Sequence, residues 1–329
     1  MLQIIKHQVR SHLYRHEALI LTYHGVLPEP LPFQVWHHLT VAEFEKQIAY
    51  LAKYFRCVSL STLLGDLARG EVPPHTVAVT FDDGYRNNLT QALPVLSRYK
   101  VPATLFITSG LVGSKQMLWP EWAVCVLAQT RLSVLLFAGQ EMTLDTVKSR
   151  EASYRLIVSA FKTMPPENIQ SAVDELIAAA GLTKAAIEGS KLGQIFRALS
   201  WDDVREMRHS GWFEFGAHTQ NHWRLSKLDS SQALNEINDP KALIEGQIGP
   251  IEYFAYPHGN PADFTTAHRT MAIEAGYRAV FTAVTNTVTP HSDLFELPRM
   301  GIGANTSFEQ FKYALHGGVA TSMRQAVPT

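Results

Sequence analysis

The sequence of 329 residues predicts an α/β fold in which parallel strands alternate with helices. Short apolar runs of strand length are each followed by a loop and then by a segment whose apolar residues recur at helical spacing. This rhythm indicates βα units around a parallel sheet or a barrel. Several of the runs also end on histidine or aspartate, and such a fold gathers functional groups at the C-terminal ends of its strands.

The first half of the chain follows this rhythm closely. Residues 18–23 form an apolar run that predicts a buried strand ending at His24. Thr40 and Glu43 make a capping-box pattern, which predicts that a helix begins at this point. The remaining elements of this half are expected as a strand at 58–60, a helix at 61–69, a strand at 77–81, a helix at 88–99 and a strand at 103–108.

The rhythm stops between residues 119 and 199. This stretch is largely helical in pattern, most clearly at 151–161 and 167–180, with two adjacent prolines between these segments. It lacks the residue types that would build a second catalytic site. The sequence therefore predicts a single domain over residues 1–329 that carries a helical insertion at 119–199.

The βα rhythm resumes after the insertion. Asp202 and Asp203 lie in the first turn of a predicted helix, where the helix dipole favours carboxylates, and Gly211 closes that helix. The elements of this part are expected as a helix at 201–210, a strand at 212–217, a helix at 230–246, a strand at 251–256, a helix at 264–275, a strand at 279–283 and a helix at 307–315.

Composition argues against several classes of protein. Hydrophobic residues are 46% and charged residues 18%, as in an ordinary globular enzyme with a large core. The 29 Lys and Arg balance 30 Asp and Glu without long runs of one sign, which argues against a nucleic-acid partner or a polybasic membrane anchor. Residues 1–16 lack the pattern of a signal peptide and no apolar run reaches the length of a membrane span, so a cytoplasmic location is expected. Cys57 and Cys125 show no metal or redox spacing and are interpreted as buried reduced thiols.

Five groups that could bind a ligand follow strand-like runs, which is more than packing alone would require: His24, Asp82, Asp83, His218 and His258. His218 and His222 are four residues apart, so both imidazoles would face one ion if the chain turns helically between them. Two imidazoles and one carboxylate leave a coordination position open for water. A second, adjacent carboxylate is then available for proton transfer, and this combination predicts a metal-assisted hydrolase.

Simpler roles exist for some of these residues. Asp82 or Asp83 could cap the turn that follows the strand, but this role explains only one of two carboxylates at a buried strand end. The pair His37 and His38 lies beside Trp36 in a loop flanked by proline, and no direct role is assigned to it.

Three segments resemble the first three motifs of the polysaccharide deacetylases, the NodB-homology family or carbohydrate esterase family four. The segments are residues 80–85 (TFDDGY), 218–222 (HTQNH) and 256–259 (YPHG), and their order and separations agree over residues 19–302. The resemblance implies a distorted (β/α) barrel that hydrolyses N-acetyl or O-acetyl groups on a glycan. We expect N-acetyl groups, in preference to O-acetyl groups, on an amino sugar or polysaccharide.

The resemblance also implies roles for individual residues. Asp83, His218 and His222 would hold one divalent cation, with zinc as the expected ion, and Asp82 would be the general base. This agrees with the chemistry of such sites, because the cation lowers the pKa of water and a nearby carboxylate takes the proton. The backbone near His258 would help to stabilise the oxyanion.

The sequence departs from the family pattern at two points. The Leu-x-His motif that supplies the general acid in many members has no convincing copy. One branch of the family instead begins with a Tyr-His motif, which Tyr23 and His24 resemble, so His24 is assigned as the acid.

The third motif usually carries an arginine before its proline, and Phe254 stands in that place. Arg299 is the candidate replacement as partner of Asp82, with a surface or strand-end role as the alternative. Tyr256, Pro257 and His258 are assigned to the substrate and oxyanion side of the site.

The sequence thus predicts a metal-dependent deacetylase of an acetylated glycan or amino sugar. One alternative is an amidase that uses the same metal chemistry on a small non-glycan substrate. The other is a glycan-binding homologue without turnover; a purely structural protein would have no reason to bring these groups together. Aromatic platforms along a groove would favour a polymeric sugar, and the candidates are Trp36, Trp119, Trp122 and Trp223.

Overall fold

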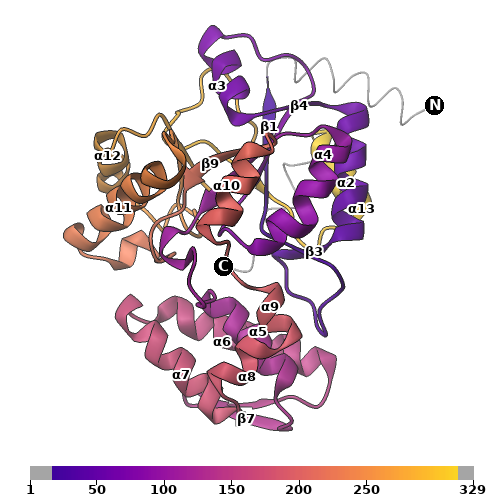
Figure 1. The fold of residues 1–329 in the computed structure, drawn as a ribbon, viewed down its shortest axis with the longest axis vertical. Helices are drawn as coiled ribbons and strands as arrows, with labels where there is room; N and C mark the ends of the chain where they lie inside the picture. Colours follow the sequence, from indigo (N-terminus) through magenta and orange to yellow (C-terminus); the bar gives the residue numbers. More distant parts are fainter. Residues whose placement is uncertain (1–16, 318–329) are drawn as a thin grey trace.

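A curled parallel sheet forms the centre of the molecule in the computed structural model, which describes residues 17–317 (Figure 1). The strand order is β11-β10-β9-β6-β5-β1-β12, and β4 pairs with the first half of β5 where β6 pairs with the second. Helices flank this sheet, so the predicted α/β, barrel-like fold is confirmed. The strands are β1 (Ala18–Tyr23), β4 (Arg56–Val58), β5 (Thr76–Phe81), β6 (Ala103–Ile107), β9 (Phe213–Ala217), β10 (Tyr253–Ala255), β11 (Ala279–Phe281) and β12 (Met300–Gly301).

The two edges of the sheet approach each other at one seam. Phe281 of β11 forms a parallel bridge with Leu297, and Met300 shortly afterwards pairs with Leu21 of β1. The short segment that includes Leu297 and Met300 therefore links both edge strands. This seam gives the sheet the character of a distorted barrel rather than an open, flat sheet.

Alternation along the strands separates the helix-facing core from the barrel interior. On β5, Val77, Val79 and Phe81 belong to the main hydrophobic cluster beneath the helices, whereas Ala78 belongs to the cluster on the opposite face. That opposite face continues through Thr80, which is fully buried, toward the end of the strand. The interior thus changes from apolar to polar in the direction of the strand ends.

The helices around the sheet occur near their predicted positions. The capping box of Thr40 and Glu43 is present and starts α2. The predicted helix at 88–99 opens with a π-helical turn before it becomes regular. The helices of this part are α2 (Val41–Tyr54), α3 (Leu60–Arg69), η1 (Asn88–Ala92), α4 (Leu93–Tyr99), η2 (Ser109–Leu111), α10 (Trp201–His209), η4 (Leu225–Lys227), α11 (Ser230–Ile248), α12 (Thr266–Glu274) and α13 (Phe308–Leu315).

The segment between β6 and α10 forms a separate helical lobe, at the bottom of Figure 1, with a hydrophobic cluster of its own. The sequence did not predict the antiparallel hairpin in this lobe, formed by β7 and β8. Ala138 and Gly139, between the two strands, both have positive φ, as a tight hairpin turn requires. The elements of the lobe are α5 (Trp119–Gln129), β7 (Val134–Phe137), β8 (Gln140–Thr143), α6 (Val147–Thr163), η3 (Pro166–Asn168), α7 (Ile169–Ala179), α8 (Lys184–Gly189) and α9 (Lys191–Ile195).

The lobe packs against the loop that follows the first strand. A small parallel pair, β2 (Gly25–Leu27) and β3 (His38–Thr40), brackets this loop. Phe33 and Val35 from the loop are buried in the hydrophobic cluster of the lobe. The loop is therefore held between the barrel and the lobe.

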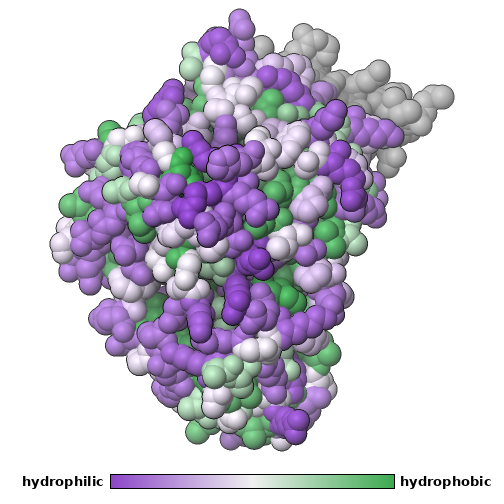
Figure 2. All heavy atoms as spheres, viewed as in Figure 1, coloured by the Kyte–Doolittle hydropathy of each residue, from purple (hydrophilic) through white to green (hydrophobic). Residues whose placement is uncertain are grey.

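Figure 2 shows hydrophilic residues over most of the visible face, with apolar residues in small scattered groups. Within residues 17–317, no helix combines the length and the apolar character needed to cross a bilayer. Residues 1–16, on which the expectation about a signal peptide rests, lie outside the described residues. Both cysteines are free thiols; Cys125 is buried as expected, but Cys57 is only partly buried.

Candidate metal centre

A cavity of about 590 Å³ opens at the C-terminal ends of the strands, between the barrel and the helical lobe. Of the catalytic, metal-binding and oxyanion residues that the sequence predicts, only Pro257 does not line the cavity. The others line it together: His24, Asp82, Asp83, His218, His222, Tyr256, His258 and Arg299. The fold thus gathers residues from four strand ends and from the seam into one place.

Asp83, His218 and His222 bring three potential ligand atoms within 4.8 Å of one another. Asp83 Oδ1 lies 3.3 Å from His222 Nε2 and 3.7 Å from His218 Nε2. A tetrahedral cation with bonds of about 2.0–2.1 Å to such atoms separates its ligands by about 3.4 Å. The spacing of these three side chains therefore fits a small divalent cation.

The surroundings of Asp83 also fit a cation. Its Oδ1 atom is buried and has no hydrogen-bond partner among the described residues, which is costly for a carboxylate oxygen. Burial, and then the charge of Asp82, raises the pKa of the Asp83 carboxyl well above its usual value. A bound cation would oppose both effects and would complete the coordination of this oxygen.

His218 is oriented by the neighbouring strand. Its Nδ1–H donates a hydrogen bond of 2.7 Å to the carbonyl of Ala255, at the end of β10. Because Nδ1 is engaged in this way, Nε2 is the nitrogen available to a cation. The ring is almost completely buried, and burial lowers the pKa of His218, so the neutral form that can bind a metal is favoured.

The segment between His218 and His222 does not form the helical turn that their spacing allowed. Thr219 and His222 adopt positive φ values of 60° and 58°, so this segment is a loop with two left-handed residues. Such backbone is strained for residues other than glycine and persists where other contacts stabilise it. The loop, rather than a helix face, brings the two imidazoles to within 5.0 Å between ring centroids.

Glu236 of α11 supplies those stabilising contacts. Its Oε2 accepts hydrogen bonds from the backbone N–H groups of Gln220 at 3.0 Å and Asn221 at 2.9 Å, and its Oε1 accepts from the Asn221 side chain. Glu236 was not predicted, because spacing alone does not distinguish a buried carboxylate on an amphipathic helix from an exposed one. Its partners lie 15 and 16 residues earlier in the chain.

Asp82 lies on the interior face of the barrel, two residues beyond Thr80. Arg299 donates two parallel hydrogen bonds to it, from Nη1 to Oδ1 at 2.7 Å and from Nη2 to Oδ2 at 2.8 Å. Burial acts to raise the pKa of Asp82, but the positive charge of Arg299 and the nearby His218 outweigh it and lower the pKa to about 2. This carboxylate is therefore ionised at neutral pH.

Arg299 belongs to the seam between the sheet edges and is 1% exposed, so the alternative of a surface role is wrong. Its Nε–H donates to the carbonyl of Thr282 at 3.0 Å, just after β11. The guanidinium thus joins the β11 side of the seam to the end of β5. Its contact with Asp82 is the one expected of a replacement for the arginine that the third motif lacks.

His24 lines the cavity just after β1, beside the loop that precedes β3. The rings of Trp36 and His37 contact it, with centroids 5.3 and 5.8 Å away. Its Nδ1 is buried without a hydrogen-bond partner in the described part of the chain. Burial is the main cause that lowers the pKa of His24 well below its usual value.

The third motif contributes a rigid turn. The Tyr256 ring stacks on Phe264 at 4.1 Å, and His258 has a φ of 61° with its ring 5.2 Å from that of His222. Gly259 also has positive φ, and a Cβ there would come within 2.6 Å of the Ala283 nitrogen, so only glycine fits.

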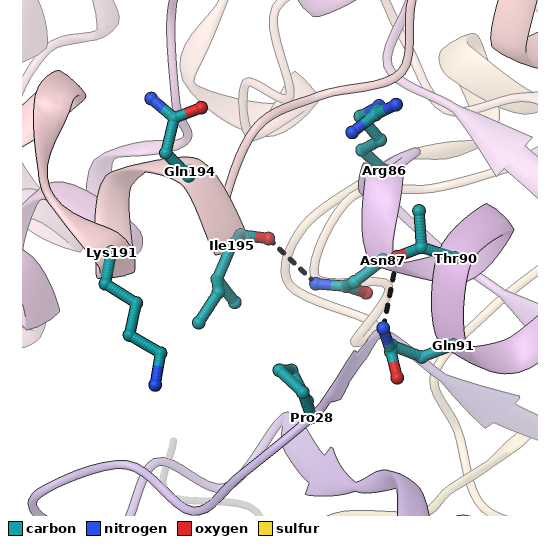
Figure 3. Close-up of a pocket in the computed structure, with 8 residues that line it drawn as sticks. All are labelled: Pro28, Arg86, Asn87, Thr90, Gln91, Lys191, Gln194 and Ile195. Carbon is teal, nitrogen blue, oxygen red and sulfur yellow. Dashed lines mark hydrogen bonds between the residues drawn. The ribbon is translucent and has the colours of Figure 1, made fainter.

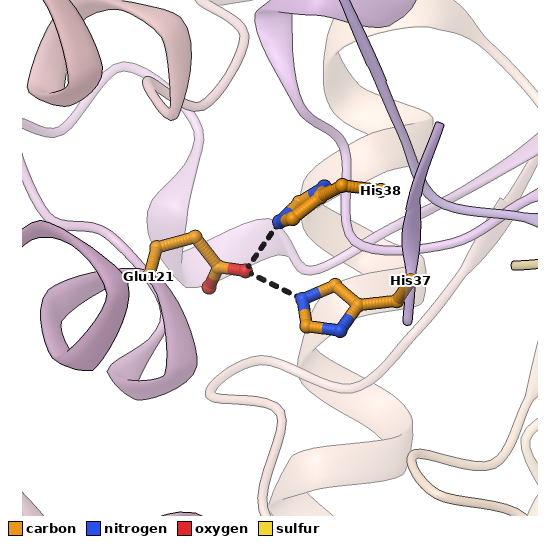
Figure 4. A group of neighbouring side chains, drawn as sticks. All are labelled: His37, His38 and Glu121. Carbon is orange, nitrogen blue, oxygen red and sulfur yellow. Dashed lines mark hydrogen bonds and ion pairs between the residues drawn. The ribbon is translucent and has the colours of Figure 1, made fainter. Parts of the chain in front are cut away.

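Aromatic residues from the loop and the lobe complete the cavity wall. Trp36 and Trp119 line the cavity, as the sequence allowed, but Trp122 is buried in the core of the lobe and Trp223 is not part of the lining. The pair His37 and His38, to which the sequence assigned no role, meets Glu121 of α5 in a buried cluster (Figure 4).

A second cavity, of about 330 Å³, lies where α9 of the lobe approaches η1 (Figure 3). Asn87 connects the two parts there: its Oδ1 accepts from the Val26 N–H and its Nδ2 donates to the Ile195 carbonyl. The lining contains no histidine, cysteine or carboxylate, so it offers neither metal ligands nor an acid–base pair.

Comparison with known proteins places these observations in a family. A family model described as polysaccharide deacetylase matches residues 69–280, which is more than half of the chain. The poly-β-1,6-N-acetyl-D-glucosamine N-deacetylase of Staphylococcus aureus is 32% identical over 80 residues, which cover 24% of this chain and 28% of that protein. The match thus spans little more than a quarter of that relative.

Solved structures show the same fold over nearly the whole chain. The deacetylase PplD of Streptococcus pyogenes superposes with a TM-score of 0.60 at 17% identity, covering 91% of this chain and 98% of that one. IcaB from Ammonifex degensii gives a TM-score of 0.60 at 20% identity, covering 93% and 98%. At such identities the likeness concerns the fold, and the family model carries the assignment. The chain belongs to the polysaccharide deacetylase family.

Proposed function

We propose that this protein is a metal-dependent deacetylase that hydrolyses an N-acetyl group on an amino sugar or a polysaccharide. One observation carries the proposal: Asp83, His218 and His222 converge beside the ion-paired carboxylate of Asp82. Three metal ligands next to an ionised carboxylate suit hydrolysis of an amide by metal-activated water. Family membership supports removal of acetyl groups from a glycan.

Asp83, His218 and His222 would hold the cation, and two imidazoles with one carboxylate suit zinc. When bound, the cation supplies Lewis acidity that activates water and polarises the acetyl carbonyl. The other steps fall to the side chains and backbone around it.

Asp82 accepts the proton of the attacking water. The paired hydrogen bonds from Arg299 keep the carboxylate ionised and hold it in one orientation, which favours transfer to the same position in every turnover. His24 donates a proton to the leaving nitrogen as the C–N bond breaks. Because burial lowers the pKa of His24, only the protonated fraction of the protein is ready for this step, and that fraction is small at neutral pH. The backbone around His258, in its rigid turn, provides N–H groups on the oxyanion side.

The acetylated amino sugar is the preferred substrate for two reasons. The Staphylococcus aureus relative is named for an N-deacetylase of poly-β-1,6-N-acetyl-D-glucosamine. In addition, Trp36 presents aromatic surface at the cavity, on which a sugar ring can stack, whereas Trp119 lines the cavity but is buried and stacks on Phe161. The name of the relative supports an N-acetyl group over an O-acetyl ester, and the aromatic surface supports a sugar over a non-glycan amide.

The test combines the metal content of freshly purified protein with an assay of acetate release from N-acetylglucosamine oligomers. We expect about one divalent cation per chain, activity that chelation abolishes and zinc restores, and loss of both metal and activity in His222→Ala. Full activity of metal-free protein would overturn the proposal.

A substrate panel separates the rival functions. Turnover of simple N-acetyl amides but not of the oligomers would indicate a small-molecule amidase with the same metal chemistry. Binding of the oligomers by calorimetry, without acetate release at any metal loading, would indicate a glycan-binding homologue.

A further inference from the structure

The helical lobe contributes a fully buried carboxylate next to the cavity. Glu121 lies in the first turn of α5 and is 0% exposed. Three donors converge on its Oε1 atom: His37 Nε2 at 2.9 Å, His38 Nε2 at 3.2 Å and the Tyr85 hydroxyl at 2.7 Å (Figure 4 shows the two histidines). A buried charge needs such compensation, and here all of it comes from barrel-side segments that border the cavity.

His37 connects this carboxylate to the cavity. Because Glu121 engages Nε2, both the tautomer and the orientation of the His37 ring are determined. The ring then contacts His24 and Trp36, and Trp36 contacts His24 in turn. Since no hydrogen bond holds Nδ1 of His24 within the described residues, these ring contacts are what orients it.

We propose that Glu121 and His37 form a positioning pair for His24. Glu121 holds the His37 ring, and His37 with Trp36 holds His24 in the orientation that delivers a proton to the leaving nitrogen. The inference rests on the proposed deacetylase function and gives the lobe a part in it. Glu121 and His37 touch none of the reacting atoms, so they act through His24.

Hydrolysis of the amide moves one proton to Asp82 and takes another from His24. The oxygen of water bonds to the acetyl carbon, its proton passes to Asp82, the C–N bond breaks, and the nitrogen takes a proton from His24. Acetic acid and a free amine leave, and the acid loses the second proton of the water to solvent as acetate. Solvent then returns a proton to His24 and removes one from Asp82. Misplacement of a donor by about 1 Å can cost about a hundredfold in such a transfer.

A second metal site is the rival interpretation of the cluster, since its ligand atoms lie within 4.8 Å of one another. The geometry favours positioning. All three donors lie at ordinary hydrogen-bond distances from one oxygen, and Tyr85 is not a usual ligand of the expected ions.

The leaving group offers a readout that a general loss of structure does not reproduce. An N-acetylated sugar needs a proton on its nitrogen, whereas an aryl acetate expels a phenolate that needs none. For Glu121→Ala and His37→Ala, we expect the ratio of kcat/KM on the amide to that on the ester to fall at least about tenfold. In the double variant the same ratio should fall no further than in either single variant, because the two residues act as one unit.

Matched variants control for folding. Glu121→Gln keeps the shape and one acceptor oxygen, and should recover part of the ratio. Glu151→Ala removes a different contact between the lobe and the same loop, in which Glu151 accepts from the Gln34 N–H at 3.0 Å, and should leave the ratio unchanged. An equal loss on both substrates, or additive losses in the double variant, would overturn the proposal.

Imidazole spectra test the positioning without turnover. In long-range ¹H–¹⁵N spectra, Glu121→Ala should move the signals of His37 and His24, and Glu151→Ala should move neither; an unmoved His24 signal contradicts the inference. If the wild-type protein releases no acetate but Glu121→Ala still shifts His24, the proposed function fails and the positioning pair stands. Two tightly bound ions per chain, one of them lost in Glu121→Ala, would make the cluster a metal site instead.

Discussion

Asp82 and Asp83 are neighbours in the chain, yet their surroundings differ sharply. Both oxygens of Asp82 accept hydrogen bonds from Arg299, and its pKa is lowered to about 2 in spite of burial. Asp83 has an unpartnered oxygen within the described structure, and its pKa is raised, mainly by burial. Two carboxylates whose environments differ in this way suit different tasks, one as a base and one as a ligand.

We expect Asp82→Asn to keep the metal and lose activity by about a hundredfold to ten-thousandfold, because the amide cannot take a proton. The measurement is acetate release together with metal content. Asp83→Asn is the matched comparison, since the same change one residue later should release the metal as well. Metal loss in Asp82→Asn would contradict the division of roles.

The residues that the sequence could indicate are those whose motif is local. Asp82, Asp83, His218 and His222 lie in two short segments, so their spacing, their places after strand-like runs and the resemblance of both segments to known motifs were visible in the sequence. Arg299 was reached because the third motif lacks its arginine and another had to replace it. The contact between His37 and Glu121 spans 84 residues and joins a loop to the insertion, and no local pattern encodes such a pairing.

At the level of elements, periodicity predicted most strands and helices of the barrel within a few residues, but not the short strands β2, β3 and β12. It failed where the backbone departs from regular structure. The loop between His218 and His222 imitates helical spacing, but left-handed residues and the contacts of Glu236 produce the approach of the imidazoles. The hairpin in the lobe was missed because its strands are short and lie among helices.

Glu236→Gln should weaken metal binding by about tenfold to a hundredfold, since residues that orient metal ligands contribute on this scale. The substitution replaces a charged acceptor of two backbone N–H groups by a weaker, neutral one. Titration with a chelator measures the affinity. Glu245→Gln, at the other end of α11, removes an ion pair with Lys241 instead and should leave the metal affinity unchanged.

At the scale of the whole molecule, the cavity exists because the lobe covers one side of the barrel opening. The loop before β3 lies between the two, with its apolar residues in the lobe and its histidines on Glu121. Burial opposes the charge of Glu121, but the hydrogen bonds from His37 and His38 lower its pKa below the usual value. Ionised Glu121 therefore stabilises the contact between lobe and barrel.

This stabilisation has a definite pH dependence. A carboxyl with a lowered pKa in the folded state contributes fully above its unfolded value of about 4.3 and loses the contribution as pH falls toward its folded value. The difference in melting temperature between wild type and Glu121→Gln should therefore be largest above about pH 5. This difference should shrink as the pH falls further. Thermal unfolding followed by circular dichroism from pH 7 downward measures this, and a gap that widens in acid would contradict it.

The seam has a consequence for how this chain can change. Arg299 hydrogen-bonds to Thr282 on the β11 side of the seam and also to the carboxylate of Asp82. A single side chain therefore contributes both to the stability of the barrel, where Met300 pairs with β1, and to the ionisation and orientation of the base. A substitution of Arg299 that changes the stability of the barrel would therefore also change the rate of hydrolysis. Adaptation to another temperature or substrate must then proceed through other parts of the molecule.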